Sequence, residues 1–293
     1  MDKRGGLFGG IVALCLLIGV NAVAESLGEL GGIQTFSKGF AITADRGGSE
    51  TLCKNPASLA LTGPEVTTGY ASWFDSSYAV ASLSGGMPLD EHFQIGFSLP
   101  VKFISDIPET IEENGQAKQL GSFSDIESEA SLAVQYTPFE GLHTGVKVDY
   151  FIHTLNTDSA SGMGFGAGII YDYQAFTVGA SVLNMGNTKM AWKHHAAEVL
   201  LQEVNLGLTY KGDYGVKVLA DMTLVGHENN RINLGVEWQI IPEFTVNGGL
   251  MDVSETPLLT LGTALKMQGV TFLYAFAQHP ELGSIHKIGI TLQ

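Results

Sequence analysis

The chain has no arrangement of residues that is typical of a catalytic centre. A Gly-x-Ser-x-Gly elbow, a phosphate-binding glycine loop and a Cys-x-x-Cys pair are all absent from the sequence. His194 and His195 are adjacent and follow Lys193, but no further ligand stands at a metal-binding spacing. The residues therefore predict a protein that is not an enzyme, with no resident metal ion and no cofactor.

The charge balance of the chain excludes one class of partner. The 293 residues include 30 acidic and 15 basic side chains, which gives a formal net charge of −15. Binding of nucleic acid needs clustered Lys and Arg side chains that neutralise phosphates. We therefore expect no nucleic-acid partner.

Acidic residues are concentrated between positions 103 and 129, and this segment has two interpretations. An acidic outer loop can bind divalent cations that it shares with lipid phosphates. A solvated, mobile face is the more common reason for such a composition. Against Lys118, the segment carries Asp106, Glu109, Glu112, Glu113, Asp125, Glu127 and Glu129.

The first 24 residues have the three parts of a secretory signal peptide. Lys3 and Arg4 form a basic region, a short apolar run follows, and Ala22-Val23-Ala24 is a small-x-small cleavage site. The apolar run is too short for a membrane anchor. We therefore expect residues 1–24 to be removed on export, which leaves Cys53 as the single cysteine and permits no disulfide within the chain.

Large apolar residues alternate with small or polar ones along most of the chain after residue 63, with the period of a β-strand. In residues 231–241, for example, every second residue is a large apolar one. Most such segments have the roughly nine to eleven residues that a tilted strand needs to cross a bilayer. We count fourteen of them, at 64–73, 77–86, 92–102, 127–137, 141–154, 162–172, 174–184, 201–211, 214–224, 231–241, 243–252, 257–266, 268–278 and 284–292.

The connections between these segments alternate between tight turns and longer loops, which is typical of outer-membrane barrels. We therefore predict an all-β protein, a transmembrane antiparallel β-barrel of about fourteen strands over residues 64–293. A soluble β-sandwich, which the same alternation permits, is disfavoured by the number and length of the segments. Tight turns are expected at 138–140, 173, 212–213, 242 and 267, and longer loops at 103–126, 155–161, 185–200, 225–230, 253–256 and 279–283.

The alternation also assigns several charged and polar side chains to the inside of the barrel. On the lipid-facing side a charge would cost about 2–4 kcal/mol near the bilayer midplane. Inside, such groups have two interpretations: paired charges that seal and stabilise a narrow barrel, or the lining of a polar conduit, and the first is more common. The lumen-facing set comprises Glu127, Glu129, Gln135, Lys147, Asp149, Lys217, Asp221 and Glu237.

Residues 33–63 differ in character from the alternating segments. The runs 40–48 and 52–60, which include Asn55-Pro56-Ala57, resemble the N-terminal segment of the PorV/PorQ-like proteins, members of the FadL-like outer-membrane barrel superfamily. The closing hairpin, with Tyr274-Ala275-Phe276 and residues 281–288, is similar as well. The family's acidic pair falls where Gly47-Gly48 stand, and its frequent aromatic falls at Lys54, so details of this segment depart from the pattern.

The resemblance implies that residues 25–63 form a plug segment, with Asn55, Pro56 and Ala57 as its motif. Proline fixes its own φ and pushes the preceding residue out of the helical region, so Asn55-Pro56 predicts a turn. The Asn55 side chain either holds this turn against the inner wall, or the turn simply reverses the chain before the first strand.

The resemblance also sets the expected function. PorV/PorQ-like members serve protein secretion and surface attachment, so a non-enzymatic accessory with periplasmic or surface protein partners is our first prediction. The alternative is a FadL-like channel for hydrophobic molecules such as long-chain fatty acids, which would need an opening in the wall and an apolar pocket near the plug. A barrel-embedded lipid hydrolase lacks its nucleophile. Each reading places the protein in the lipid of the outer membrane of a Gram-negative-type bacterium.

Overall fold

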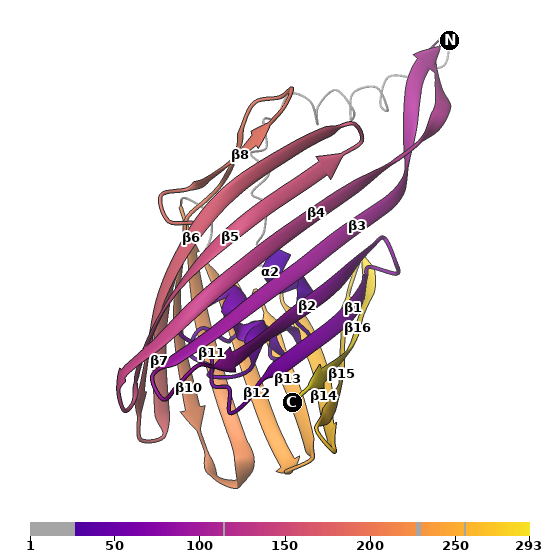
Figure 1. The fold of residues 1–293 in the computed structure, drawn as a ribbon. Coiled ribbons are helices and arrows are strands. Elements are labelled where there is room, and N and C mark those ends of the chain that lie inside the picture. Colours follow the sequence, from indigo (N-terminus) through magenta and orange to yellow (C-terminus); the bar gives the residue numbers. More distant parts are fainter. Residues whose placement is uncertain (1–26, 114, 227–229, 255) are drawn as a thin grey trace.

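Fourteen antiparallel strands form a closed barrel in the computed structural model, which describes residues 27–113, 115–226, 230–254 and 256–293 (Figure 1). The expected signal peptide lies outside the described residues. The barrel strands are β1 (Glu65–Trp73), β2 (Tyr78–Pro88), β3 (Phe93–Glu113), β4 (Gln116–Phe139), β5 (Leu142–Leu155), β6 (Asp158–Tyr173), β7 (Phe176–Leu183), β10 (Glu203–Lys211), β11 (Val216–Val225), β12 (Arg231–Ile241), β13 (Phe244–Met251), β14 (Leu258–Met267), β15 (Val270–His279) and β16 (Gly283–Leu292).

Strands that follow one another in the sequence are neighbours around the ring. The first and last strands close it, with Val66 opposite Leu292 and Ser72 opposite His286. The connection from β7 to β10 carries two further short strands, β8 (Thr188–Trp192) and β9 (Glu198–Leu200), which pair with each other while β8 also pairs with β6. Closure gives a partner to the two strands that would otherwise be edges, as a membrane requires.

The predicted fold is confirmed, because every expected segment overlaps one barrel strand. Two expected loops are wrong. Strands β3 and β4 continue through most of 103–126 and rise above the rest of the barrel (Figure 1), and β5 joins β6 through residues 156–157 instead of a loop over 155–161. The many charges of 103–126 obscure its alternation, although Ile107 lies opposite Phe123 in the extended ladder. The short turn is possible because Asn156 adopts a positive φ of 53°.

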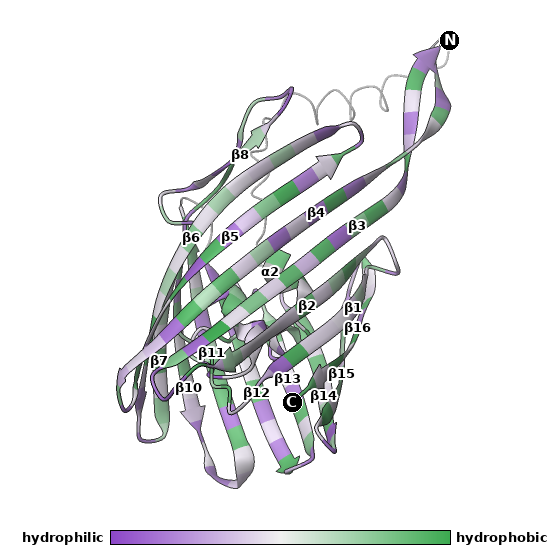
Figure 2. Cartoon of the chain, viewed as in Figure 1, coloured by the Kyte–Doolittle hydropathy of each residue, from purple (hydrophilic) through white to green (hydrophobic). Residues whose placement is uncertain are grey.

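The outer surface of the barrel is covered with large apolar side chains. One row crosses four strands, with Phe97 opposite Leu132, Leu132 opposite Val148 and Val148 opposite Phe165. Leu132 is 63% exposed and Phe165 is 53% exposed. Figure 2 shows the alternation of apolar and polar residues along these strands. So much exposed apolar surface is unfavourable in water and favourable against lipid tails.

Residues 27–63 lie inside the barrel, where most of their side chains are buried (Figure 1). They contain the short helices α2 (Leu27–Gly31) and α3 (Gln34–Ser37), the 3₁₀ turn η1 (Ser49–Cys53), and a parallel bridge between Gly47 and Leu59. We call residues 27–63 the plug. In the described part of the chain, no helix is both long and apolar enough to span a membrane.

The outward apolar row predicts how the barrel responds to a charge. Val146 is 61% exposed on the outer face of β5, so Val146→Arg places a guanidinium against lipid. We expect the free energy of unfolding to fall by roughly 2–4 kcal/mol, measured by urea titration of the protein folded into lipid vesicles. Glu140→Arg, in the β4–β5 turn, is the control and should change it little. Equal stability of the two variants would contradict a lipid-facing outer surface.

Candidate functional site

The plug can lie against the wall because the wall strands carry glycine where the plug passes. A Cβ at Gly145 would lie 2.3 Å from the backbone of Pro56, and a Cβ at Gly249 would lie 2.2 Å from the Gly39 nitrogen. Both distances are far inside van der Waals contact. The small residues on the inner face of the strands are therefore the surface that the plug packs on. Nine further wall glycines would place a Cβ within 2.7 Å of a plug atom: Gly69, Gly86, Gly96, Gly168, Gly179, Gly207, Gly235, Gly262 and Gly289.

The candidate motif Asn55-Pro56-Ala57 forms a turn within the plug. The Asn55 side chain is buried; its Nδ2 donates to the Thr43 carbonyl at 2.7 Å, and its Oδ1 accepts from the Ala57 N–H at 2.9 Å. The wall carbonyl of Ile169 lies at the longer distance of 3.5 Å. A Cβ at Gly168 would meet Asn55 Oδ1 at 2.0 Å. The side chain thus closes the turn, and contact with wall glycines seats it.

The predicted lumen-facing set lies on the inner side of the barrel, but in separate groups. Lys147 pairs with Asp149 at 3.1 Å and with Glu129 at 3.7 Å. Ser131 donates to Asp149 at 2.6 Å. Gln135 is fully buried close to His143. Glu127 pairs with Lys102 nearer the other end of β4.

The remaining members of the set bind the plug. Lys217 and Glu237 pair at 2.8 Å, and Glu237 lies 3.3 Å from Lys38 of the plug, which also pairs with Asp45. Burial alone would lower the pKa of Lys38, but the Asp45 and Glu237 carboxylates raise it above its usual value. These groups are therefore paired and fixed, which fits the sealing interpretation better than a polar conduit.

Asp221 makes the most extensive contact between wall and plug. One of its oxygens accepts hydrogen bonds from the N–H groups of Ile42 and Thr43, at 2.9 and 2.8 Å, and from the Thr43 hydroxyl at 2.7 Å. Lys54 of the plug lies 3.6 Å from the same oxygen. A buried carboxylate with this many donors fixes the plug backbone in one position.

Lys287 of β16 is an inward residue that the sequence analysis missed. Its Nζ donates to the carbonyls of Leu30 and Gly32 at 2.7 and 3.0 Å and lies over the rings of Phe36 and Trp73, at 4.3 and 4.7 Å. The ammonium thus caps the α2–α3 segment and gains cation–π stabilisation. Its signal in the sequence was its position in the alternation of β16, between the outward residues His286 and Ile288.

Beside these charges, the plug and the wall enclose a large apolar region, which we call the inner apolar cluster. It joins the plug helices to strands β1, β2, β14, β15 and β16. Its buried residues are Leu27, Leu30, Ile33, Phe36, Phe40, Ala71, Trp73, Val80, Leu258, Leu273, Ala275, Ala277 and Ile285.

The wall is interrupted on one edge of β6. Strand β7 pairs with β6 from Ala167 to Tyr173, Met185 N–H donates to the Phe165 carbonyl, and β8 pairs again at Ala160 and Ser161. Between these contacts, residues 162–164 have no ladder partner on that edge among the described strands. We call this interruption the wall gap.

The β7–β10 connection passes behind the wall gap, on the inner side. A Cβ at Gly162 would lie 2.7 Å from Met190 Sδ, and one at Gly164 would lie 2.8 Å from Thr188 Oγ1. Buried apolar side chains lie directly behind: Phe151, Ala160, Met190 and Leu200, with Trp192 packed against them, which we call the gap cluster. A cavity of about 30 Å³ is bordered by Phe151, Met190 and Leu200 of this cluster and by Leu27 of the inner apolar cluster.

Comparison with known proteins identifies the fold. No protein-family model and no curated protein matches the sequence. The crystal structure of the toluene transporter TodX of Pseudomonas putida aligns with a TM-score of 0.68 over 89% of this chain and 96% of its own, at 14% identity. A Pseudomonas aeruginosa FadL homologue aligns with a TM-score of 0.59 over 89% of this chain and 98% of its own, at 10% identity. The fold is that of the FadL-like barrels. Neither structure supports the narrower PorV/PorQ-like resemblance.

Two adjacent glycines of β13 allow a test of how closely the plug packs against the wall. Gly249→Ala adds a methyl group where the Gly39 nitrogen stands, whereas a Cβ at Gly248 has its nearest neighbour at 3.8 Å. We expect Gly249→Ala to lower the free energy of unfolding by about 1–3 kcal/mol and to make the plug sensitive to protease. Gly248→Ala is the matched control and should be neutral within roughly 0.5 kcal/mol. Identical protease patterns for both variants would mean that the plug does not lie on this glycine.

Proposed function

We propose that this protein is an outer-membrane channel for the uptake of hydrophobic small molecules. The observation that carries the proposal is the wall gap at residues 162–164, where the ladder is interrupted and buried apolar side chains lie directly behind the wall. Met163 is 56% exposed on the outer side of the gap, and Met190 lies behind it. An opening at this place would offer a route that is apolar on both sides.

The interior supports a hydrophobic cargo rather than an ionic one. Residues of the gap cluster and Leu27 of the inner apolar cluster line the same small cavity, and Phe36, Phe40 and Trp73 are buried in the inner apolar cluster. Each square ångström of apolar surface transferred from water to such surroundings contributes about 25 cal/mol. The charges of the lumen are in contrast engaged in ion pairs and hydrogen bonds with one another or with the plug, so they offer an ion few free partners.

The descriptions of structures with a similar fold support a hydrophobic cargo. One similar structure is described as a toluene transporter and a monoaromatic hydrocarbon channel, and the other as a FadL homologue. We therefore name monoaromatic hydrocarbons as one cargo class to test, and long-chain fatty acids, which the sequence resemblance implies, as the other. An accessory role in secretion or surface attachment, which the sequence resemblance placed first, has less support from these comparisons.

The proposal includes the location and the processing of the chain. A cleaved signal at residues 1–24, a plug over 25–63 and a barrel over 64–293 agree with the sequence pattern and with the apolar outer surface. Such a protein contacts outer-membrane lipid on its outside and a hydrophobic ligand on its inside.

A disulfide across the wall gap tests the proposed route. In a Cys53→Ala background, Gly164→Cys with Thr188→Cys places two thiols where a Cβ and a hydroxyl would lie 2.8 Å apart. The disulfide ties the β7–β10 connection to β6, so we expect uptake of radiolabelled oleate and toluene to fall, and to recover when reductant is added. The assay uses Gram-negative cells that lack their own channels for these compounds.

The control disulfide leaves the gap free. Ser72→Cys with Ser76→Cys joins two hydroxyl positions that lie 3.1 Å apart in the β1–β2 turn, and it should not change uptake. If the parent protein carries neither compound, the proposed function is wrong. If it does so but the disulfide at the gap has no effect, the route lies elsewhere.

A further inference from the structure

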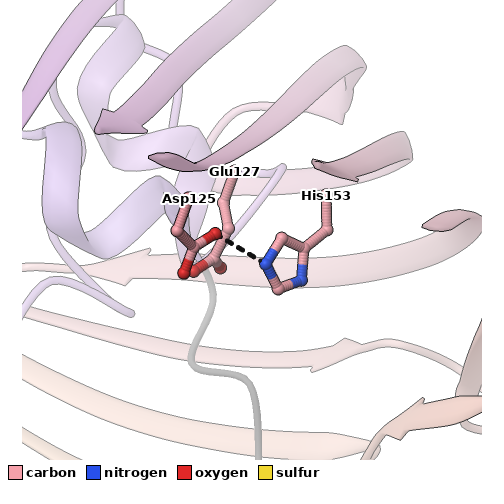
Figure 3. Close-up of side chains that lie close together, drawn as sticks. All are labelled: Asp125, Glu127 and His153. Atoms are coloured by element: carbon pink, nitrogen blue, oxygen red, sulfur yellow. Dashed lines mark hydrogen bonds and ion pairs between the residues drawn. The ribbon is translucent and has the colours of Figure 1, made fainter. Parts of the chain in front are cut away.

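The register of β4 and β5 brings three metal-binding side chains together on the inner face of the wall. Asp125 and Glu127 are two residues apart on β4, and His153 of β5 lies directly opposite Glu127. His153 Nε2 is 2.7 Å from Asp125 Oδ1. One donor atom from each of the three residues lies within 4.8 Å of the others. In Figure 3 both carboxylates point toward the imidazole ring.

The surroundings of these donors are partly shielded from solvent. Their side chains are only 16–19% exposed. The cavity of about 30 Å³ described above borders Glu127 and His153, and this volume matches the space that one water molecule or small ion occupies. Met190 and Glu198 line the same cavity. Space for a ligand thus lies beside two of the three donors, Glu127 and His153.

The donor set selects a class of ion. An imidazole nitrogen with two carboxylate oxygens is a combination that Zn²⁺ accepts, and three protein ligands leave a position for water. With a neutral imidazole, the carboxylates contribute two negative charges, and Lys102 offsets one of them through its contact with Glu127 Oε1 at 2.6 Å. A divalent cation that displaces this ammonium neutralises the two carboxylates.

We propose that Asp125, Glu127 and His153 form a binding site for a divalent transition-metal ion, with Zn²⁺ as the preferred occupant. The ion joins β4 to β5 at the base of the extended β3–β4 hairpin. The ring of His153 lies 4.8 Å from the ring of Trp192, so the ion also fixes the β7–β10 connection that covers the wall gap. The site itself does not depend on the proposed function, since binding is measured without any hydrophobic cargo.

A second histidine group on the same connection is the main competitor. His194 Nδ1 and His195 Nε2 lie 3.2 and 3.3 Å from the two oxygens of Asp158. Both histidine side chains are more than 70% exposed and each is held by the same carboxylate. The experiment must therefore distinguish His153 from this pair.

Calorimetric titration of Zn²⁺ into the purified full-length protein, without a histidine tag and after removal of metals, tests the site. We expect one ion per chain. His153→Gln and Asp125→Asn should each weaken binding at least about tenfold, since even loss of a group that only orients a ligand has an effect of that size. His194→Ala combined with His195→Ala is the matched control and should leave the affinity unchanged. Heat-modifiable migration on gels verifies that each variant is folded.

Two further measurements give results that would not be expected if these three side chains only paired with one another and bound no metal ion. Lys102→Met removes the competing ammonium, so we expect tighter binding of Zn²⁺. Cu²⁺ at the site should quench the fluorescence of Trp192, one of three tryptophans, and the quenching should disappear in Trp192→Phe. Absence of saturable binding by the parent protein overturns the proposal. So does binding that survives His153→Gln and is lost in the His194/His195 double variant.

Discussion

The pairing of β1 with β16 is the constraint on which the rest of the structure depends. Without it the chain would be an open sheet whose two edges expose backbone groups, and no such edge is tolerated in lipid. Once the sheet is closed, successive side chains point alternately outward and inward. Apolar residues such as Leu132 face outward, toward lipid, and their small or polar neighbours face the lumen. The interior is then too narrow for large residues on every strand and also for a plug, so glycines line the wall where the plug backbone passes.

The sequence allowed the fold to be predicted because alternation is a property of each single strand, and a sheet that lies in lipid must then be closed. Every expected segment overlaps a strand, since a two-residue period can be read without knowledge of neighbours. The β3–β4 extension was missed because its strands do not show this alternation. Outside the bilayer neither face of a hairpin must be apolar, so its strands carry charges such as Glu109 and Glu112 and lose the pattern.

The candidate sites were less accessible to sequence reasoning, because they depend on register between distant strands. The inward direction of Asp221 or Lys147 follows from alternation, but their partners do not: Asp221 binds plug residues 178 and 179 positions away. His153 and Glu127 are adjacent only because of the β4–β5 register. The wall gap has no signature in composition, since Gly162 and Gly164 resemble the glycines that seat the plug. Lys287 stood in a recognised hairpin, yet its role depends on carbonyls 255 and 257 residues away.

For the proposed uptake function, the distribution of contacts indicates which part of the molecule would move. Withdrawal of the whole plug would break the contacts that Lys287 and Asp221 make with plug carbonyls and N–H groups, and removal of one partner from a buried charged contact is strongly destabilising. The β7–β10 connection is held mainly by uncharged contacts. It pairs with β6 at two positions, Met185 N–H donates to the Phe165 carbonyl, and Met190 and Leu200 pack in the gap cluster. Local opening is favoured where fewer stabilising contacts must be broken. Movement at the wall gap, with the plug retained, would keep the buried charged contacts of the plug intact, and an ion bound by His153, whose ring contacts Trp192, would oppose that movement.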